Sequence, residues 1–227
     1  METHMKKIEL NGLLFQYRET GRPSAPPLVA LHALGLNAES WDEVASILGG
    51  KYRVLALDQR GHGGSVRTDE YSFELMRDDL FHFANAMDLE KFTLMGHSMG
   101  GTVSYLFSEA YPRRVERLVV EDTPPPFTGK FFEFPPEPSE PLPFDWKVVP
   151  SIIQQLNEPN PEWWDRLSEI LTPTLLIGGG DASHVPQEKL LEVSKLIPNC
   201  QLITVDGAGH FVHLAKLDAF LNAVKPF

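Results

Sequence analysis

The sequence predicts an α/β protein with a mostly parallel eight-stranded sheet that has helices on both faces. Two observations predict this fold class. Short aliphatic and β-branched runs recur along the 227-residue chain, and segments with a helical pattern separate most of them. Strands that alternate with helices build parallel sheets whose two faces are both buried. The length suits one large core, so we expect a single domain over residues 1–227.

The first two strands are expected to form a hairpin, because Asn11-Gly12 between two apolar runs is a strong turn signal. The predicted strands are 7–10, 13–17, 28–31, 53–57, 92–95, 118–121, 174–177 and 201–205. The predicted helices are 40–48, 72–87, 99–111, 161–171, 186–196 and 214–224. After the hairpin, each of these strands is expected to lie parallel to its neighbours.

Residues 123–160 interrupt the alternation after the sixth predicted strand. This segment is crowded with prolines, beginning with Pro124-Pro125-Pro126, and six Phe or Trp residues lie among them. Proline disfavours long helices and central strands, whereas a disordered linker rarely holds so many aromatics. We therefore predict a compact, irregular flap that buries its aromatic side chains against the body of the protein.

Composition excludes several classes of partner. The net charge of −11 argues against nucleic acid and against anionic membranes, because both would repel the chain. Cys200 is the only cysteine, so an internal disulfide is excluded. The apolar runs are too short for a membrane span and the N-terminus lacks a signal-peptide core, so we expect a cytoplasmic protein. The sequence does not predict an oligomeric state.

Ser98 is the central residue of a Gly-x-Ser-x-Gly motif, Gly96 to Gly100, that joins a predicted strand to a predicted helix. A serine on so sharp a turn needs neighbours without side chains, two residues before and two after it. The free N–H groups at the helix N-terminus would stabilise an oxyanion forming beside its hydroxyl. We interpret Ser98 as a nucleophile.

A serine nucleophile needs a histidine base within hydrogen-bond reach. On a strand-to-helix turn the expected chain order is serine, acid, histidine. Three histidines follow Ser98, and we favour His210, because it comes after a strand end and a glycine-rich turn. His213 is expected to begin the last helix, and His184 to be a solvated loop residue.

The histidine in turn needs a carboxylate to fix its tautomer. Asp181 comes just beyond the predicted strand 174–177, and ligand groups gather at the carboxyl ends of parallel strands. Asp122 ends the preceding strand and is the alternative, although an Asx turn or a cap would also explain it. We favour Asp181 as the acid.

Five motifs in order resemble the α/β-hydrolase superfamily: 31–35 with Trp41, 58–65, 96–101, 173–178 with Asp181 and Pro186, and 207–210. The resemblance implies that the backbone N–H groups of Leu34 and Met99 form an oxyanion hole. One departure is Ala33, which stands where the family usually has glycine and would reshape the oxyanion loop.

A second departure is the flap, which occupies the place of the helical cap common in the family. The pocket is therefore expected to be open and rimmed by aromatics, with Trp163 and Trp164 near its edge. Candidate pocket residues are His32, His97, Phe127, Phe131 and Trp146, although a hydrogen-bonded brace of the oxyanion loop would explain His32 and packing near the pocket wall would explain His97.

A serine at the elbow excludes dehalogenation and epoxide opening, which in this family need an aspartate there. We expect hydrolysis of a small-molecule carboxylic ester with an acyl chain of about four to eight carbons, because each buried methylene favours binding until a short pocket is full. Lactones, thioesters or a carbon–carbon bond beside a ketone are alternatives for the same apparatus, as is perhydrolysis. A non-enzymatic ligand sensor that retains the triad is a further alternative. No metal cluster, phosphate loop or dinucleotide fingerprint is recognisable, so no cofactor is expected.

Overall fold

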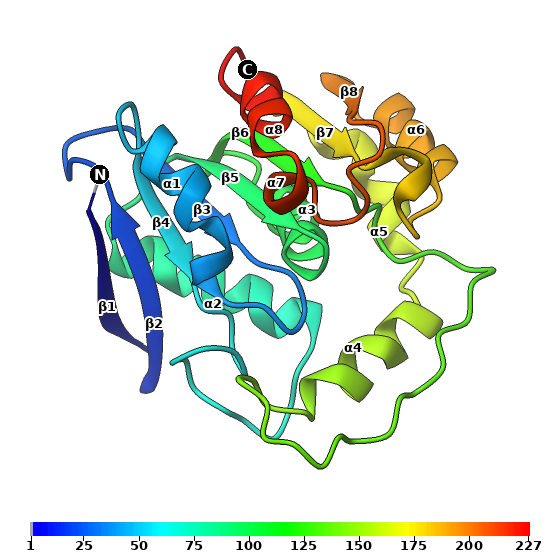
Figure 1. Cartoon of the computed structure of the whole chain (residues 1–227), viewed down its shortest axis with the longest axis horizontal. Coiled ribbons are helices and arrows are strands. Elements are labelled where there is room, and N and C mark those ends of the chain that lie inside the picture. The colour runs from blue at the N-terminus through cyan, green and yellow to red at the C-terminus, as the bar shows by residue number, and fades with distance from the viewer. Residues whose placement is uncertain (1) are drawn as a thin grey trace.

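A twisted eight-stranded sheet forms the centre of the computed structural model, which describes residues 2–227 (Figure 1). The strands lie in the order β1-β2-β4-β3-β5-β6-β7-β8. Their bounds are β1 Thr3–Leu10, β2 Leu13–Thr20, β3 Pro27–Leu31, β4 Arg53–Leu57, β5 Phe92–His97, β6 Val115–Glu121, β7 Thr174–Gly178 and β8 Cys200–Thr204. β1 and β2 form the predicted hairpin, and the strands from β4 to β8 are parallel. The predicted fold class is confirmed.

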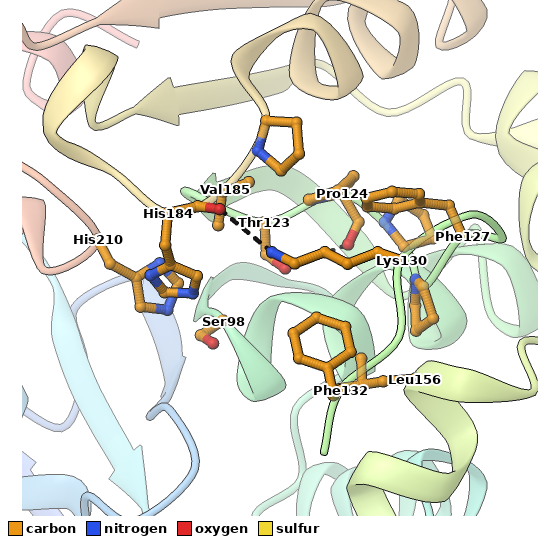
Figure 2. Close-up of a pocket in the computed structure, with 13 residues that line it drawn as sticks. Ser98, Thr123, Pro124, Phe127, Lys130, Phe132, Leu156, His184, Val185 and His210 are labelled. Atoms are coloured by element: carbon orange, nitrogen blue, oxygen red, sulfur yellow. Dashed lines mark hydrogen bonds between the residues drawn. The ribbon is translucent and has the colours of Figure 1, made fainter.

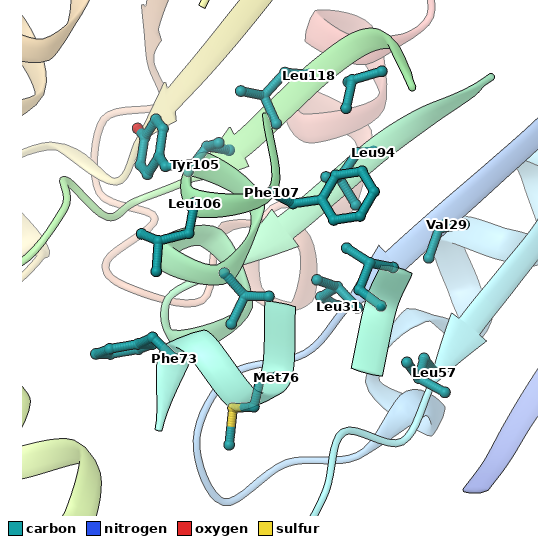
Figure 3. Packing of buried hydrophobic residues seen from close by; sticks show 14 of the residues in the cluster. Val29, Leu31, Leu57, Phe73, Met76, Leu94, Tyr105, Leu106, Phe107 and Leu118 are labelled. Atoms are coloured by element: carbon teal, nitrogen blue, oxygen red, sulfur yellow. The ribbon is translucent and has the colours of Figure 1, made fainter. Parts of the chain in front are cut away.

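Helices cover both faces of this sheet. They are α1 Asp42–Leu48, α2 Phe73–Ala86, α3 Met99–Ala110, α4 Val148–Asn157, α5 Glu162–Asp165, α6 Gln187–Leu196, α7 Val212–Ala215 and α8 Leu217–Val224, with short 3-10 turns η1 Ala38–Trp41, η2 Arg166–Glu169 and η3 Gly180–Ala182. Apolar residues of α2, α3 and α6 share one core cluster with the sheet, and those of α1 and α8 share a second. Figure 3 shows part of the first cluster, in which Tyr105, Leu106 and Phe107 of α3 pack near strand residues.

The central strand β5 is buried at all six positions, and the helix that follows it is buried along almost its whole length. Each fully buried Leu or Phe side chain contributes about 1.5–3 kcal/mol to folding. The turn between β5 and α3 is therefore held from both sides by buried elements. No helix within residues 2–227 combines the length and the apolarity that crossing a bilayer would require.

The segment after β6 departs from its prediction in two ways. It first runs as an extended arc (Figure 1), but it then forms α4, a ten-residue helix that we did not predict. Pro150 is the third residue of α4, where its missing N–H has no intrahelical partner to lose. The expectation that the flap buries its aromatics is wrong for Phe131 and Phe134, which are 73% and 53% exposed.

Four chain segments leave the sheet at its carboxyl edge, after β5, β6, β7 and β8. They carry Ser98, Asp122, Asp181 and His210, in that order. Because β5 to β8 are neighbours in the sheet, the fold brings the beginnings of these four segments to the same edge.

Candidate active site

Ser98 lies on a strained turn between β5 and α3, with φ of 52° and ψ of −116°. A non-glycine residue in such a conformation costs about 1–3 kcal/mol, which the surrounding structure must offset. A Cβ on Gly96 would lie 2.3 Å from the carbonyl oxygen of Gly100, and one on Gly100 would lie 2.4 Å from that of Leu31. Both glycines are therefore required by the close packing of the turn, as the motif predicted.

His210 makes its side-chain hydrogen bond with Asp122. The distance from its Nδ1 to the Asp122 Oδ2 atom is 2.9 Å. The carboxylate is fully buried and the imidazole is 11% exposed. With Nδ1 as the donor, the free Nε2 atom is left as an acceptor, and His210 lines the same cavity as Ser98 (Figure 2).

The interpretation of Asp181 as the partner of His210 is wrong in this structure. Asp181 is exposed and lies in η3, where Gly180 turns the chain with φ of 70°. Asp122 directly follows β6, and its N–H still donates to the Ile177 carbonyl oxygen at 2.8 Å. The sheet ladder therefore holds Asp122 at the rim, whereas three further residues carry Asp181 away from it.

The glycine-rich turn after β7 contributes to the site by binding Asp122. The Gly179 N–H donates to Asp122 Oδ1 at 2.8 Å, and Gln187 Nε2 donates to the same oxygen at 3.2 Å. The Ser183 hydroxyl donates to Oδ2. Burial alone would raise the pKa of Asp122, but the hydrogen bonds from His210, Ser183, Gly179 and Gln187 outweigh it and lower this pKa. Asp122 is thus an ionised carboxylate at neutral pH.

The N–H groups of Leu34 and Met99 are free to bind an oxyanion, because neither has a hydrogen-bond acceptor within residues 2–227. The loop of Leu34 is tied to the elbow, since Gly100 N–H donates to the His32 carbonyl oxygen at 3.2 Å. Two buried histidines brace it further: His32 Nε2 accepts from Gln59 N–H at 3.0 Å, and His62 Nε2 accepts from Gly35 N–H at 3.1 Å.

Burial lowers the pKa of His32 to about 4 and that of His62 to about 3. Both rings are consequently neutral acceptors at neutral pH, as the two hydrogen bonds require. His32 is buried and is absent from the cavity wall, so its prediction as a pocket residue is wrong, whereas the alternative of a hydrogen-bonded brace of the loop agrees with its bond to Gln59 N–H. Ala33 fits the loop, where its carbonyl oxygen accepts from Leu36 N–H at 3.1 Å.

A cavity of about 110 Å³ opens beside Ser98 and His210. Its other lining residues are Thr123, Pro124, Pro125, Pro126, Phe127, Lys130, Phe132, Leu156, His184, Val185 and Pro186. Phe127 therefore lies where the sequence placed it. Phe131 and Trp146 do not line this cavity, and the neighbouring Phe132 takes the place expected for Phe131.

Two further histidines surround His210. His184 is an exposed loop residue, as predicted, but its ring centroid lies 4.4 Å from that of His210, so it also belongs to the site. His97 is fully buried, and its Nε2 donates to the His210 carbonyl oxygen at 2.8 Å. His97 thus supports the backbone of His210 and, contrary to expectation, is absent from the cavity wall.

Glu121, His97 and His213 form a buried polar cluster behind His210. Each offers one ligand atom within 4.8 Å of the others, a spacing that a metal ion could use. The two oxygens of Glu121 are already acceptors, from the Nδ1 of His213 at 2.6 Å and from its backbone N–H at 3.0 Å. Trp41 stacks on His213 with ring centroids 4.2 Å apart. The donor set therefore fits a hydrogen-bonded pair that fixes the start of α7 beside His210.

We expect Glu121→Gln to destabilise the protein by about 1–3 kcal/mol, because it weakens a buried hydrogen-bonded pair that water cannot replace. Urea unfolding would measure the change. Glu116→Gln is the matched control, since Glu116 is an exposed glutamate on the same strand. Equal unfolding midpoints for the two variants would show that the Glu121–His213 pair contributes nothing to stability.

Comparisons with known proteins agree with this architecture. Residues 26–150 match a family model described as the alpha/beta hydrolase fold. The chain is 29% identical over 252 residues to the sn-1-specific diacylglycerol lipase ABHD11 of Mus musculus, covering 91% of this chain and 82% of that protein. It is 26% identical over 234 residues to Esterase YbfF of Escherichia coli (strain K12), covering 88% and 92%.

A solved structure, the thioesterase domain from the curacin biosynthetic pathway, superposes with a TM-score of 0.84 at 20% identity and covers 98% of this chain and 99% of that one. At that identity the likeness concerns the fold alone. The family match covers more than half of the chain, and the strand order and the elbow agree with it. The chain therefore belongs to the α/β-hydrolase fold family.

Proposed function

We propose that this protein is a serine hydrolase that cleaves carboxylic esters with short to medium acyl chains. Ser98 would be the nucleophile, His210 the base and Asp122 the acid. The observation that carries the proposal is the Asp122–His210 hydrogen bond beside a cavity that Ser98 also lines. The relatives named esterase and lipase support ester hydrolysis in general.

In the proposed reaction, His210 Nε2 takes the proton of the Ser98 hydroxyl as Oγ attacks the ester carbonyl carbon. Asp122 holds the imidazole in the tautomer that leaves Nε2 free and stabilises the imidazolium that forms. The N–H groups of Leu34 and Met99 would stabilise the oxyanion. His210 then protonates the departing alcohol, and the same steps with water release the acid from Ser98.

The cavity supports a short acyl group as the preferred substrate. Its wall is formed largely by proline and aromatic side chains, and its volume is about 110 Å³, below the roughly 300–1,000 Å³ of pockets for drug-sized ligands. The same apparatus would cleave lactones and thioesters, so a substrate panel needs all three.

The direct test is turnover of p-nitrophenyl esters from acetate to decanoate, together with lactones and thioesters, and labelling by a fluorophosphonate. We expect sustained ester turnover, with labelling confined to Ser98. A burst of one equivalent without turnover would favour the ligand-sensing alternative. Labelling elsewhere, or none, would contradict the assignment of Ser98.

Replacing Phe127 by alanine should shift the preferred acyl chain toward longer esters. The ring forms part of the cavity wall, and each extra methylene accommodated would gain about 0.8 kcal/mol. Values of kcat/KM across the p-nitrophenyl series measure the shift. The matched control is Phe131→Ala, because Phe131 is 73% exposed and lies four residues away. A chain-length profile that moves in the control but not in Phe127→Ala would contradict this account of the pocket.

A further inference from the structure

Lys130 is the only Lys or Arg among the residues that line the cavity of Ser98 and His210. It comes from the irregular part of the flap and is partly buried. Figure 2 shows its side chain extending from the flap toward the loop of His184. There its Nζ donates to the His184 carbonyl oxygen at 3.2 Å and lies 4.8 Å from the ring centroid of Phe132. The ammonium group is thus held at the cavity wall, where it remains accessible to solvent.

This ammonium group has no carboxylate partner. Within residues 2–227 no Asp or Glu oxygen lies within 4.0 Å of Lys130 Nζ, although the chain has 31 acidic residues against 20 basic ones. Several other Lys and Arg side chains also have no carboxylate partner, but Lys130 is the one that lines the cavity of Ser98 and His210. A cation is costly to desolvate without a counter-charge, so a ligand anion would be favoured at this point.

The positive charge of Lys130 also acts on His184, which lies beside His210. Burial is the main cause of the lowered pKa of His184, and the neighbouring charges of His210 and Lys130 lower this pKa further. An ammonium group has three donors, and the His184 carbonyl oxygen takes one of them. Two donors remain for a substrate group.

We propose, on the basis of the function proposed above, that the substrate carries a carboxylate that Lys130 binds while Ser98 attacks the ester. The substrate class is thus a small anionic ester rather than a neutral acyl ester. Phe132 would shield one side of this ion pair, since its ring centroid lies 4.8 Å from Lys130 Nζ, while the other side stays accessible to solvent. Lys130 would select the substrate without taking part in bond making or breaking.

The test uses pairs of esters that differ only in charge. On the acyl side, monomethyl succinate is compared with methyl 4-oxopentanoate, in which a methyl ketone replaces the carboxylate. On the alcohol side, acetoxyacetate is compared with acetoxyacetone. A charge-assisted hydrogen bond should raise kcat/KM for the anionic member of at least one pair by about ten- to a hundredfold. The preference should shrink as salt is added, because ions screen a partly exposed charge.

Variants at Lys130 then assign the preference to its charge. Lys130→Met should bring the ratio of kcat/KM between the anionic and the neutral member of a pair to about one, and Lys130→Arg should retain most of the preference. Lys189→Met is the matched control, since Lys189 also lies near an aromatic ring of the flap, 5.3 Å from the Phe127 centroid, but pairs with Glu192 and does not line the cavity.

Two outcomes would overturn the proposal. One is the absence of any anionic preference in the unmodified protein. The other is an equal loss for charged and neutral esters in Lys130→Met, which would make Lys130 a structural tie between the flap and the His184 loop. In both cases the unmodified protein would still turn over neutral esters and be labelled at Ser98, so a failure here is distinguishable from a failure of the proposed triad.

Discussion

Ser98→Ala should lower kcat for ester hydrolysis by about a millionfold, the loss seen when the nucleophile of a serine hydrolase is removed. The proposed mechanism has no other route, because His210 would lose the hydroxyl that it activates. The protein should fold, since Ser98 is partly exposed at the cavity and the turn depends on the glycines around it. Steady-state turnover and circular dichroism measure the two effects.

Ser168→Ala is a suitable control, because Ser168 is an exposed serine far along the chain from the elbow. It should keep full turnover and full fluorophosphonate labelling, whereas Ser98→Ala should lose both. A well-folded Ser98→Ala protein that retained more than about a tenth of the turnover would refute the nucleophile.

Asp122→Asn should lower kcat by about ten-thousandfold, as the equivalent change does in a well-studied triad. An amide NH₂ facing His210 would favour the tautomer with a proton on Nε2, which then cannot accept the serine proton. The substitution also replaces one of the two carboxylate oxygens of Asp122, which accept hydrogen bonds from Gly179, Ser183 and Gln187, by an NH₂ group. A moderate loss of stability should therefore accompany it.

Asp181→Asn is the matched control, since Asp181 is exposed and its side chain makes no hydrogen bond within residues 2–227. It should stay within a few-fold of the unmodified kcat. The reverse order of effects would restore Asp181 as the acid and would require the turn after β7 to rearrange when substrate binds.

The sequence predicted those parts of the site that local backbone geometry dictates. The elbow is one, because its glycines and the flanking strand and helix are contiguous in the chain. Local sequence does not decide between Asp122 and Asp181 as the acid, because both follow strands that end at the same edge of the sheet. The outcome depends on where the backbone turns after each strand, and hydrogen bonds to a neighbouring strand decide that.

The side chains of the flap that face the cavity were also difficult to predict from the sequence. Successive side chains of an extended segment point to opposite sides, so a composition rich in aromatics does not say which of two neighbours faces inward. In the structure Phe132 lines the cavity and Phe131 is exposed. Likewise, proline density alone did not reveal that Pro150 occurs in a first helical turn, where it is tolerated.

The register of β5 and β6 bears on which segment of this site is left for contacts with the substrate. His97 of β5 and Glu121 of β6 are paired neighbours in the sheet. Ser98 and Asp122 are the next residues on these two strands, so the strand pairing sets the distance between their backbones. The turn after β7 supplies a backbone N–H from Gly179 and a hydroxyl from Ser183, but no carboxylate. In the proposed mechanism position 181 therefore has no catalytic role, whereas Asp122 is required. With the proposed acid after β6, the segment after β7 is left for contacts with the substrate, and His184 and Val185 of that segment already line the cavity.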